Sequence, residues 1–168
     1  MTRQRRPFLV NVAALRHRPG SSQREQRSGT LAGLAMPASR VSPVAEVAVD
    51  ALLESASGGI VVLARVVAPW EAECRRCLGQ ARGELALEVR ELYSDRGDPE
   101  LSYPLPGDRL DLEPLVRDAV LLELPQVPLC RPDCAGLCPT CGADRNEAGC
   151  SCGEVARDLR RVALDGLV

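Results

Sequence analysis

Four stretches of the chain alternate between apolar and polar residues or are strongly β-branched, which is typical of β-strands. We expect strands at residues 8–15, 44–54, 60–67 and 84–92, with a turn at residues 55–59. Strands at such short spacing, with few helical patterns between them, indicate an antiparallel sheet or an open β-barrel.

One stretch has helical periodicity instead. Asp111 can cap a helix and Pro114 falls in its first turn, while Pro125 would end it. The apolar positions recur at i, i+3, i+4, i+7 and i+8, at Leu112, Leu115, Val116, Ala119 and Val120. We therefore predict an α+β fold with one helix near 113–124 packed on the sheet, and a short terminal helix over 154–165.

Polar segments separate these elements. Residues 16–29 are rich in Arg, Ser, Gln and Gly and indicate a flexible loop, and residues 93–109 form a second polar loop with Pro and Gly. The predicted organisation is a basic N-terminal strand and loop over 1–29, a β-rich core over 30–129, and a cysteine-rich segment over 130–168.

Charge is unevenly distributed along the chain. The net charge is -2, yet the first 27 residues carry seven arginines against a single acid, Glu25. A basic arm of this kind can contact the phosphate backbone of nucleic acid, or it can be a solvated tail without a partner. The candidate nucleic-acid-binding residues are Arg3, Arg5, Arg6, Arg16 and Arg18.

The N-terminal pattern bears on localisation. Arg5 and Arg6 precede an apolar run, as in a twin-arginine export signal, but the run is short and Asn11 interrupts it. No stretch approaches the roughly 20 apolar residues of a membrane span. We expect a cytoplasmic protein without a membrane partner, in which cysteines stay reduced and favour metal.

The eight cysteines occur as four close pairs. Two thiolates separated by two residues can bind one metal ion while backbone amides point at the sulfurs, and Gly142 after Cys141 suits the tight turn. Eight thiolates suit two tetrahedral zinc sites with four sulfurs each. The pairs are Cys74 and Cys77, Cys130 and Cys134, Cys138 and Cys141, and Cys150 and Cys152.

The pairs can combine in more than one way. We favour one site from Cys74, Cys77, Cys130 and Cys134, with the last four cysteines forming a second, local site. In the alternative, one site takes four of the last six cysteines and the first pair stays free.

Other chemistries fit less well. A Cys-x-x-Cys redox centre usually opens a helix in a βαβ unit, whereas Cys74 follows a strand in a β-rich region. Rubredoxin-type iron sites have aromatic-rich cores, and aromatics are only 2% of this chain. A four-sulfur zinc site is closed, and the single histidine, His17, lies in the polar loop. We expect no enzymatic activity and no small-molecule substrate.

Three blocks carry a family resemblance. They are Cys74-Arg-Arg-Cys77-Leu78, the segment from Asp111 to Pro125, and the segment from Cys130 to Cys152 that contains Asn146. Over about residues 44–153 they resemble the YceD family of large ribosomal RNA subunit accumulation proteins. The resemblance implies a zinc-binding factor in large ribosomal subunit biogenesis, acting in 23S rRNA accumulation or processing. Its implied partner is a large-subunit rRNA precursor or a ribosomal protein. The dense thiols leave a zinc-thiolate redox sensor or chaperone as the alternative.

Overall fold

A computed structural model describes residues 6–152, apart from residues 17, 97, 99 and 148. The chain divides into two compact units. The first unit holds residues 1–72 and 82–126, and the second unit holds residues 73–81 and 127–168. This division differs from the predicted one, because the N-terminal residues belong with the core and the turn at 73–81 belongs with the cysteine-rich segment.

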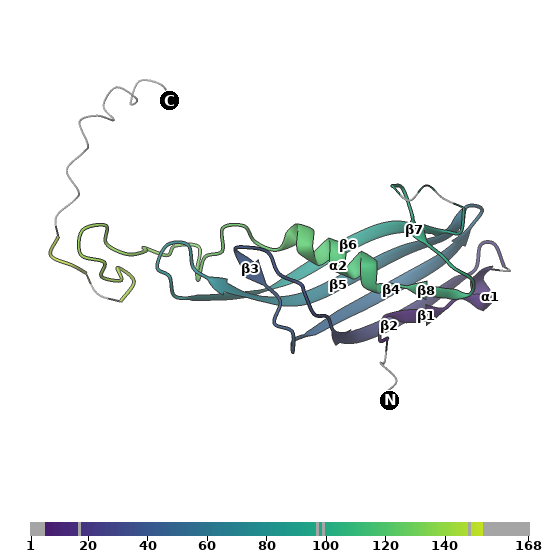
Figure 1. Ribbon diagram of the computed structural model, residues 1–168, viewed down its shortest axis with the longest axis horizontal. Coiled ribbons are helices and arrows are strands. Elements are labelled where there is room, and N and C mark those ends of the chain that lie inside the picture. The colour runs from purple at the N-terminus through teal and green to yellow at the C-terminus, as the bar shows by residue number, and fades with distance from the viewer. Residues whose placement is uncertain (1–5, 17, 97, 99, 148, 153–168) are drawn as a thin grey trace, which may run out of the picture. The chain divides into compact units, whose positions relative to one another are not determined.

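The described residues form eight strands and two helices (Figure 1). In chain order these are β1 Leu9–Asn11, α1 Ala13–Arg16, β2 Ser22–Thr30, β3 Ser39–Arg40, β4 Glu46–Ala56, β5 Gly59–Glu73, β6 Gln80–Ser94, β7 Tyr103–Pro104, β8 Arg109–Asp111 and α2 Glu113–Glu123.

The main sheet has the order β2-β4-β5-β6-β7, with β3 paired to β5, and a small sheet pairs β1 with β8. The β2–β4, β4–β5 and β3–β5 pairs are antiparallel, whereas β7 pairs with β6 in parallel. The sheet is mixed, and within the described residues it does not close into a barrel. The predicted sheet is therefore confirmed, but it is mixed and not purely antiparallel.

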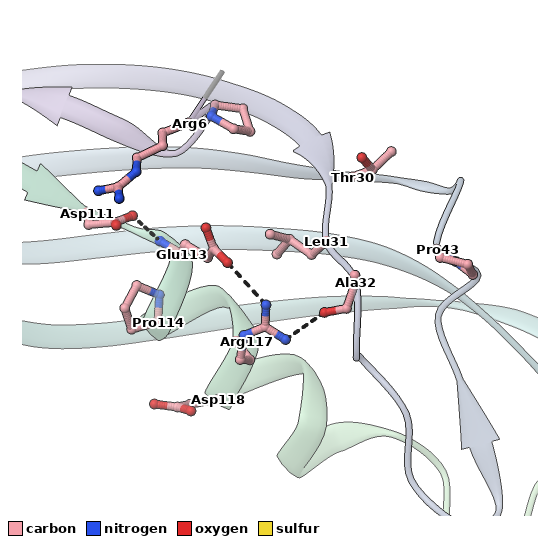
Figure 2. Close-up of a pocket in the computed structure, with 11 residues that line it drawn as sticks. Arg6, Thr30, Leu31, Ala32, Pro43, Asp111, Glu113, Pro114, Arg117 and Asp118 are labelled. Atoms are coloured by element: carbon pink, nitrogen blue, oxygen red, sulfur yellow. Dashed lines mark hydrogen bonds and ion pairs between the residues drawn. The ribbon is translucent and has the colours of Figure 1, made fainter. Parts of the chain in front are cut away.

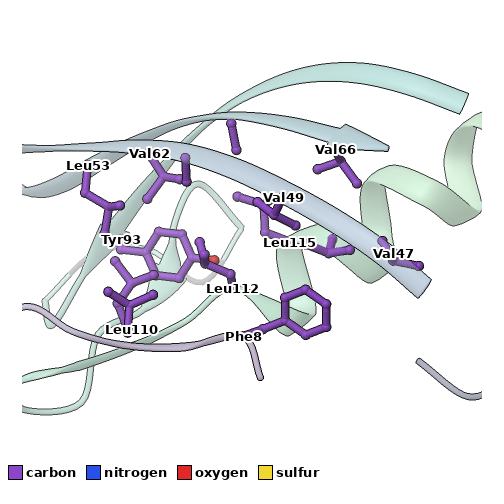
Figure 3. Close-up of a cluster of buried hydrophobic side chains, with 14 of the residues drawn as sticks. Phe8, Val47, Val49, Leu53, Val62, Val66, Tyr93, Leu110, Leu112 and Leu115 are labelled. Atoms are coloured by element: carbon purple, nitrogen blue, oxygen red, sulfur yellow. The ribbon is translucent and has the colours of Figure 1, made fainter. Parts of the chain in front are cut away.

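Alternation along β4 and β5 builds the core. Val47, Val49 and Leu53 of β4 are buried, and in the β4–β5 register Leu53 lies opposite Val62 while Val49 lies opposite Val66. Helix α2 buries Leu115, Val116 and Val120 in the same cluster. Phe8, Val10 and Leu110 from the β1–β8 side complete it (Figure 3). The apolar faces predicted by periodicity thus meet in one core.

The turn between β4 and β5 depends on a glycine. Gly59 has φ +147°, and a Cβ at this position would lie 2.0 Å from the carbonyl oxygen of Tyr93. Only glycine fits so close an approach to a neighbouring backbone. Tyr93 itself is buried, and its hydroxyl donates a hydrogen bond to the carbonyl of Asp111 over 3.0 Å.

Two expectations about the N-terminal region are wrong. The strand predicted over 8–15 ends at Asn11, whose Oδ1 accepts a hydrogen bond from the backbone N–H of Ala13 at 3.0 Å as α1 begins. The flexible loop predicted over 16–29 is largely β2, which pairs with β4 along its whole length. This strand has no apolar pattern in the sequence, because main-chain pairing and ion pairs stabilise it. One such ion pair joins Arg24 to Asp50 at 2.7 Å.

Elsewhere the differences are smaller. Strand β5 continues through Pro69 to Glu73, and the predicted loop over 93–109 contains β7 and the start of β8. Helix α2 matches the prediction, although Leu112 occupies the N-cap position and Asp111 Oδ1 instead accepts from the Glu113 N–H at 3.0 Å. The predicted helix over 154–165 lies outside the described residues. Neither helix in the described part of the chain has the length and apolarity needed to cross a membrane.

Candidate metal centres

The first tetrad consists of Cys74, Cys77, Cys130 and Cys134, all in the second unit. Cys74 and Cys77 lie in the turn between β5 and β6, and Cys130 and Cys134 follow α2 in the chain. One sulfur from each residue lies within 4.8 Å of all the others. Cys74 and Cys134 are buried, Cys77 is half-buried and Cys130 is exposed, so one side of this cluster faces solvent.

The spacing of the sulfurs fits a shared metal ion. Cys74 Sγ and Cys134 Sγ are 3.7 Å apart, and Cys77 Sγ and Cys130 Sγ are 3.6 Å apart. Tetrahedral zinc with Zn–S bonds of about 2.3 Å separates its sulfurs by about 3.8 Å. A disulfide would require about 2.05 Å. All eight cysteines are free thiols in the structure.

The turn that presents Cys74 is tightly hydrogen-bonded. The Leu78 N–H donates to the carbonyl of Cys74 at 2.9 Å, and the Cys74 N–H donates to the carbonyl of Gly79 at 2.7 Å. Leu78 has φ +60°, the left-handed conformation that closes this turn. Backbone N–H groups of Cys77 and then Arg76 point at the Cys74 sulfur and lower the pKa of its thiol to about 6. The sequence therefore folds locally so that one thiolate forms readily.

One backbone and one side-chain hydrogen bond also hold the two halves of the first tetrad together. The Leu137 N–H donates to the carbonyl of Arg76 at 3.0 Å, and the guanidinium of Arg76 donates to the carbonyl of Cys134 at 2.9 Å. Gly136 has φ +71°, and a Cβ there would lie 3.0 Å from the Arg76 carbonyl oxygen. Arg76 is thus part of the packing around the sulfurs.

The second tetrad, Cys138, Cys141, Cys150 and Cys152, has all four sulfurs within 4.8 Å of one another. The Gly142 N–H donates to the carbonyl of Cys138 at 2.9 Å, and Gly142 takes φ +75°. Backbone N–H groups of Cys141 and Thr140 lower the pKa of Cys138 to about 6. This turn repeats the local arrangement around Cys74.

Four other thiols resist ionisation because their pKa values are raised, namely Cys77, Cys130, Cys150 and Cys152. Hydrogen bonding with Cys134 raises the pKa of Cys130 to about 12, and hydrogen bonding with Cys141 raises that of Cys152 to about 12. Four thiolates in so small a space repel one another unless a cation joins them. A divalent ion could supply that charge, and four sulfurs are the full ligand set of a tetrahedral metal site.

The two tetrads are the groups that the sequence favoured. Sequence reasoning gave no role to Asn146, whose side-chain amide donates to Cys134 Sγ at 3.4 Å. Its signal in the sequence was its place in the cysteine-rich block that carries the family resemblance, where no contact was assigned to it.

The candidate nucleic-acid-binding arginines differ in their surroundings. Arg18 is exposed, whereas Arg16 is ion-paired with Asp95 at 3.0 Å. Arg6 is exposed and lines a cavity of about 710 Å³ beside the start of α2 (Figure 2). In that cavity Arg117 pairs with Glu113 at 3.1 Å and donates to the carbonyl of Ala32. Arg3 and Arg5 lie outside the described residues.

The fold and the cysteine geometry together define a β-sheet protein with two four-cysteine clusters of metal-site dimensions. Residues 62–168 match the family model described as large ribosomal RNA subunit accumulation protein YceD. The chain belongs to the YceD family, as the sequence resemblance indicated.

Curated relatives extend this similarity. An uncharacterized protein of Mycobacterium tuberculosis is 36% identical over 144 residues, which cover 81% of this chain and 70% of the relative. One of Mycobacterium leprae is 30% identical over 145 residues, covering 81% and 66%. The chloroplastic large ribosomal RNA subunit accumulation protein YCED homolog 1 of Zea mays is 38% identical over 56 residues, covering 33% and 19%. No solved structure matches the chain.

Proposed function

We propose that this chain is a non-enzymatic, zinc-binding factor that supports accumulation of large-subunit rRNA. The observation that carries the proposal is the pair of cysteine tetrads within a member of the YceD family. The name of the maize relative points to the same process.

Zinc has a structural role in this proposal. One ion would be held by Cys74, Cys77, Cys130 and Cys134, and a second by Cys138, Cys141, Cys150 and Cys152. Zinc supplies positive charge that keeps four thiolates together, and it favours the sulfur-only ligand set found here. The first ion would join the turn after β5 to the segment after α2. The protein would then act through its surface rather than through a reaction at the metal.

The proposed partner is the large-subunit rRNA precursor. Among the described candidate residues, Arg6 and Arg18 expose their side chains, and neither has an ion-pair partner within the part of the chain that the structure describes. Guanidinium groups bind phosphate oxygens through several N–H donors at once. Such contacts release counterions, so binding must weaken as salt rises.

Depletion in the organism that carries this protein tests the process. The ratio of large-subunit to small-subunit rRNA should fall, and wild-type protein should restore it. Replacing Cys74 and Cys138 with serine should abolish that restoration and the zinc content of the purified chain. A normal rRNA ratio after depletion would refute the proposed role.

Sedimentation through sucrose gradients tests the partner. Wild-type protein should comigrate with large-subunit precursors at low salt and leave them at high salt. The double change Arg6→Gln and Arg18→Gln should weaken this association, whereas the matched change Arg65→Gln and Arg90→Gln, at exposed arginines of β5 and β6, should not. If the two double variants weakened the association equally, or if comigration were the same at low and high salt, a ribosomal protein would be favoured as the direct partner.

A further inference from the structure

Asn146 lies in the loop of the second tetrad but contacts the first tetrad. It falls between Cys141 and Cys150 in the chain, and its Nδ2 donates to Cys134 Sγ at 3.4 Å. A hydrogen bond to a thiolate stabilises the charged form of the sulfur and sets how much negative charge it offers a metal. The loop of one site thus supplies a neighbour to a ligand of the other.

The contacts of Asn146 fix the orientation of its amide. Its Oδ1 accepts from the backbone N–H of Ala135 and from the guanidinium of Arg131, each at 2.8 Å. Its Nδ2 also faces Asp144 Oδ1 at 2.6 Å. Since one end meets two donors and the other meets two acceptors, the opposite orientation of the amide would lose all four contacts.

Backbone hydrogen bonds also fix the position of Asn146. Its own N–H donates to Asp144 Oδ1 at 2.8 Å, and the Arg145 N–H donates to the carbonyl of Gly136 at 2.9 Å. Leu137 and Asp144 form an isolated antiparallel bridge. The Cys138 N–H closes the loop on the carbonyl of Ala143 at 2.8 Å. Cys138 is a ligand of the second tetrad, so the same loop closure serves both Asn146 and that tetrad.

We propose that Asn146 couples the two tetrads, so that metal bound at the second tetrad positions Asn146 and strengthens metal binding at the first. Asn146 is a positioning residue in this scheme, because it acts through Cys134 and not by ligating metal. Coupling of binding free energies is reciprocal, so metal at the first tetrad must strengthen the second by the same factor. The inference rests on the proposed metal binding.

The test uses the full chain and zinc alone. Zinc stoichiometry is measured first, and two ions per chain establish the binding on which the inference depends. Fewer than two would overturn both the zinc assignment and the coupling, whereas two ions with no coupling would overturn the coupling alone. Affinity is then measured by competition with a chromogenic chelator, for wild type and for Asn146→Ala. The affinity of the first tetrad should fall 10- to 100-fold, as when other hydrogen-bond partners of metal ligands are removed.

A double-mutant cycle identifies the mechanism. Cys150→Ser disables the second tetrad and should by itself weaken the first tetrad, because the loop carrying Asn146 is no longer held by metal. Adding Asn146→Ala to Cys150→Ser should then cost little more. Losses that multiply as independent effects would overturn the coupling, as would a first-tetrad affinity within about twofold of wild type in Asn146→Ala.

A matched control and a second readout guard against simple misfolding. Asn11→Ala makes the same truncation in the first unit, where Asn11 caps α1, and should leave both zinc affinities unchanged. In the cadmium-loaded full chain, ¹¹³Cd resonances report each site separately, and loss of a signal in Cys77→Ser assigns the first. Asn146→Ala should shift that resonance and leave the other in place. A shift confined to the other resonance would overturn the assignment of Asn146 to Cys134.

Discussion

Replacing Cys77 and replacing Cys150 should have different consequences for the first unit, although each removes one thiolate from one tetrad. The first tetrad joins Cys77 to Cys130 across 53 residues, a span that includes β6, β7, β8 and α2. The second tetrad closes a short segment that contains no helix or strand among its described residues. Metal at the first tetrad would therefore act as a cross-link around much of the first unit, whereas metal at the second would act locally.

The loop length sets the magnitude. In the chain-entropy treatment, a cross-link that closes about 50 residues contributes about 4 kcal/mol to the free energy of unfolding, and one that closes about 12 residues contributes about 3 kcal/mol. Only the first contribution concerns the sheet. Against the roughly 5–15 kcal/mol by which domains are stable, a loss of about 4 kcal/mol is large and should lower Tm by more than about 10 °C.

Trp70 provides the assay, because it is the single tryptophan and lies on β5 within the first unit. Its ring packs against Gly83 of β6, where a Cβ would lie 2.7 Å from it. With zinc in excess, denaturant unfolding followed by Trp70 fluorescence should shift far to lower denaturant for Cys77→Ser. The shift for Cys150→Ser should be smaller, because the first tetrad still binds zinc, though more weakly if Asn146 couples the tetrads. A chelator should reproduce the Cys77→Ser shift in wild type. Equal shifts for the two variants, or none for either, would refute the cross-link reasoning.

Three further changes test Tyr93 and Gly59 in the first unit and the turn at Leu78 in the second unit. Burial raises the pKa of Tyr93, so the folded state keeps a proton that the unfolded chain loses above about pH 10, and stability falls as pH rises beyond that point. Tyr93→Phe should lose about 1–2 kcal/mol near neutrality, because the Asp111 carbonyl loses its donor, and should show a weaker alkaline loss in urea titrations at several pH values. Gly59→Ala should lower the free energy of unfolding by more than about 3 kcal/mol in the same titrations, since its Cβ overlaps the Tyr93 carbonyl. The control Gly58→Ala, with open space around its Cβ, should lower it by less than about 1 kcal/mol. Similar losses for the two variants would show that the turn adjusts. Leu78→Gly should strengthen zinc retention against a chelator, because it relieves a left-handed leucine that is 58% exposed, and faster zinc loss would show that the leucine side chain stabilises the turn.

The elements that could be predicted are those in which buried apolar residues recur at regular spacing along the chain. Strands β4, β5 and β6 alternate clearly, and α2 repeats its apolar residues at helical spacing. The grouping of cysteines was also accessible, because each tetrad combines two closely spaced pairs and four thiolates need a common cation. In these cases the residues that stabilise the structure are the same residues that form the recognisable sequence pattern.

Strand β2 shows where this reasoning stops. Its sequence from Ser22 to Thr30 has no large apolar residue, so neither propensity nor periodicity marks it as a strand. Its stability comes from pairing with β4, from the Arg24–Asp50 ion pair and from the hydrogen bond between Ser28 and Glu46. Those partners are about 20 residues away in the chain, and only the folded register brings them together.

Asn146 escaped prediction for a related reason. A single polar residue between cysteines has no period, and its importance depends on Cys134, a ligand of the other tetrad. The candidate arginines show the same limit, because a count of charges cannot tell that Arg16 is ion-paired with Asp95 while Arg18 is exposed. Charge and polarity indicate what kind of group a side chain can bind. The fold determines which such group lies within its reach.

The different structural roles of the two tetrads, one long-range and one local, bear on how the protein would act on rRNA. A closed four-sulfur site offers no position for a reacting group, so metal can influence an RNA partner only through the surface that it holds in place. Arg131 and Arg145 illustrate this, since both are exposed and both are bonded to the framework between the tetrads, through Asn146 and Gly136. If Asn146 couples the tetrads, loss of either ion would loosen the segment that presents these two guanidinium groups. Zinc depletion should then reduce association with rRNA precursors in the sedimentation experiment even at low salt, whereas unchanged comigration of the metal-free chain would place the RNA contacts elsewhere.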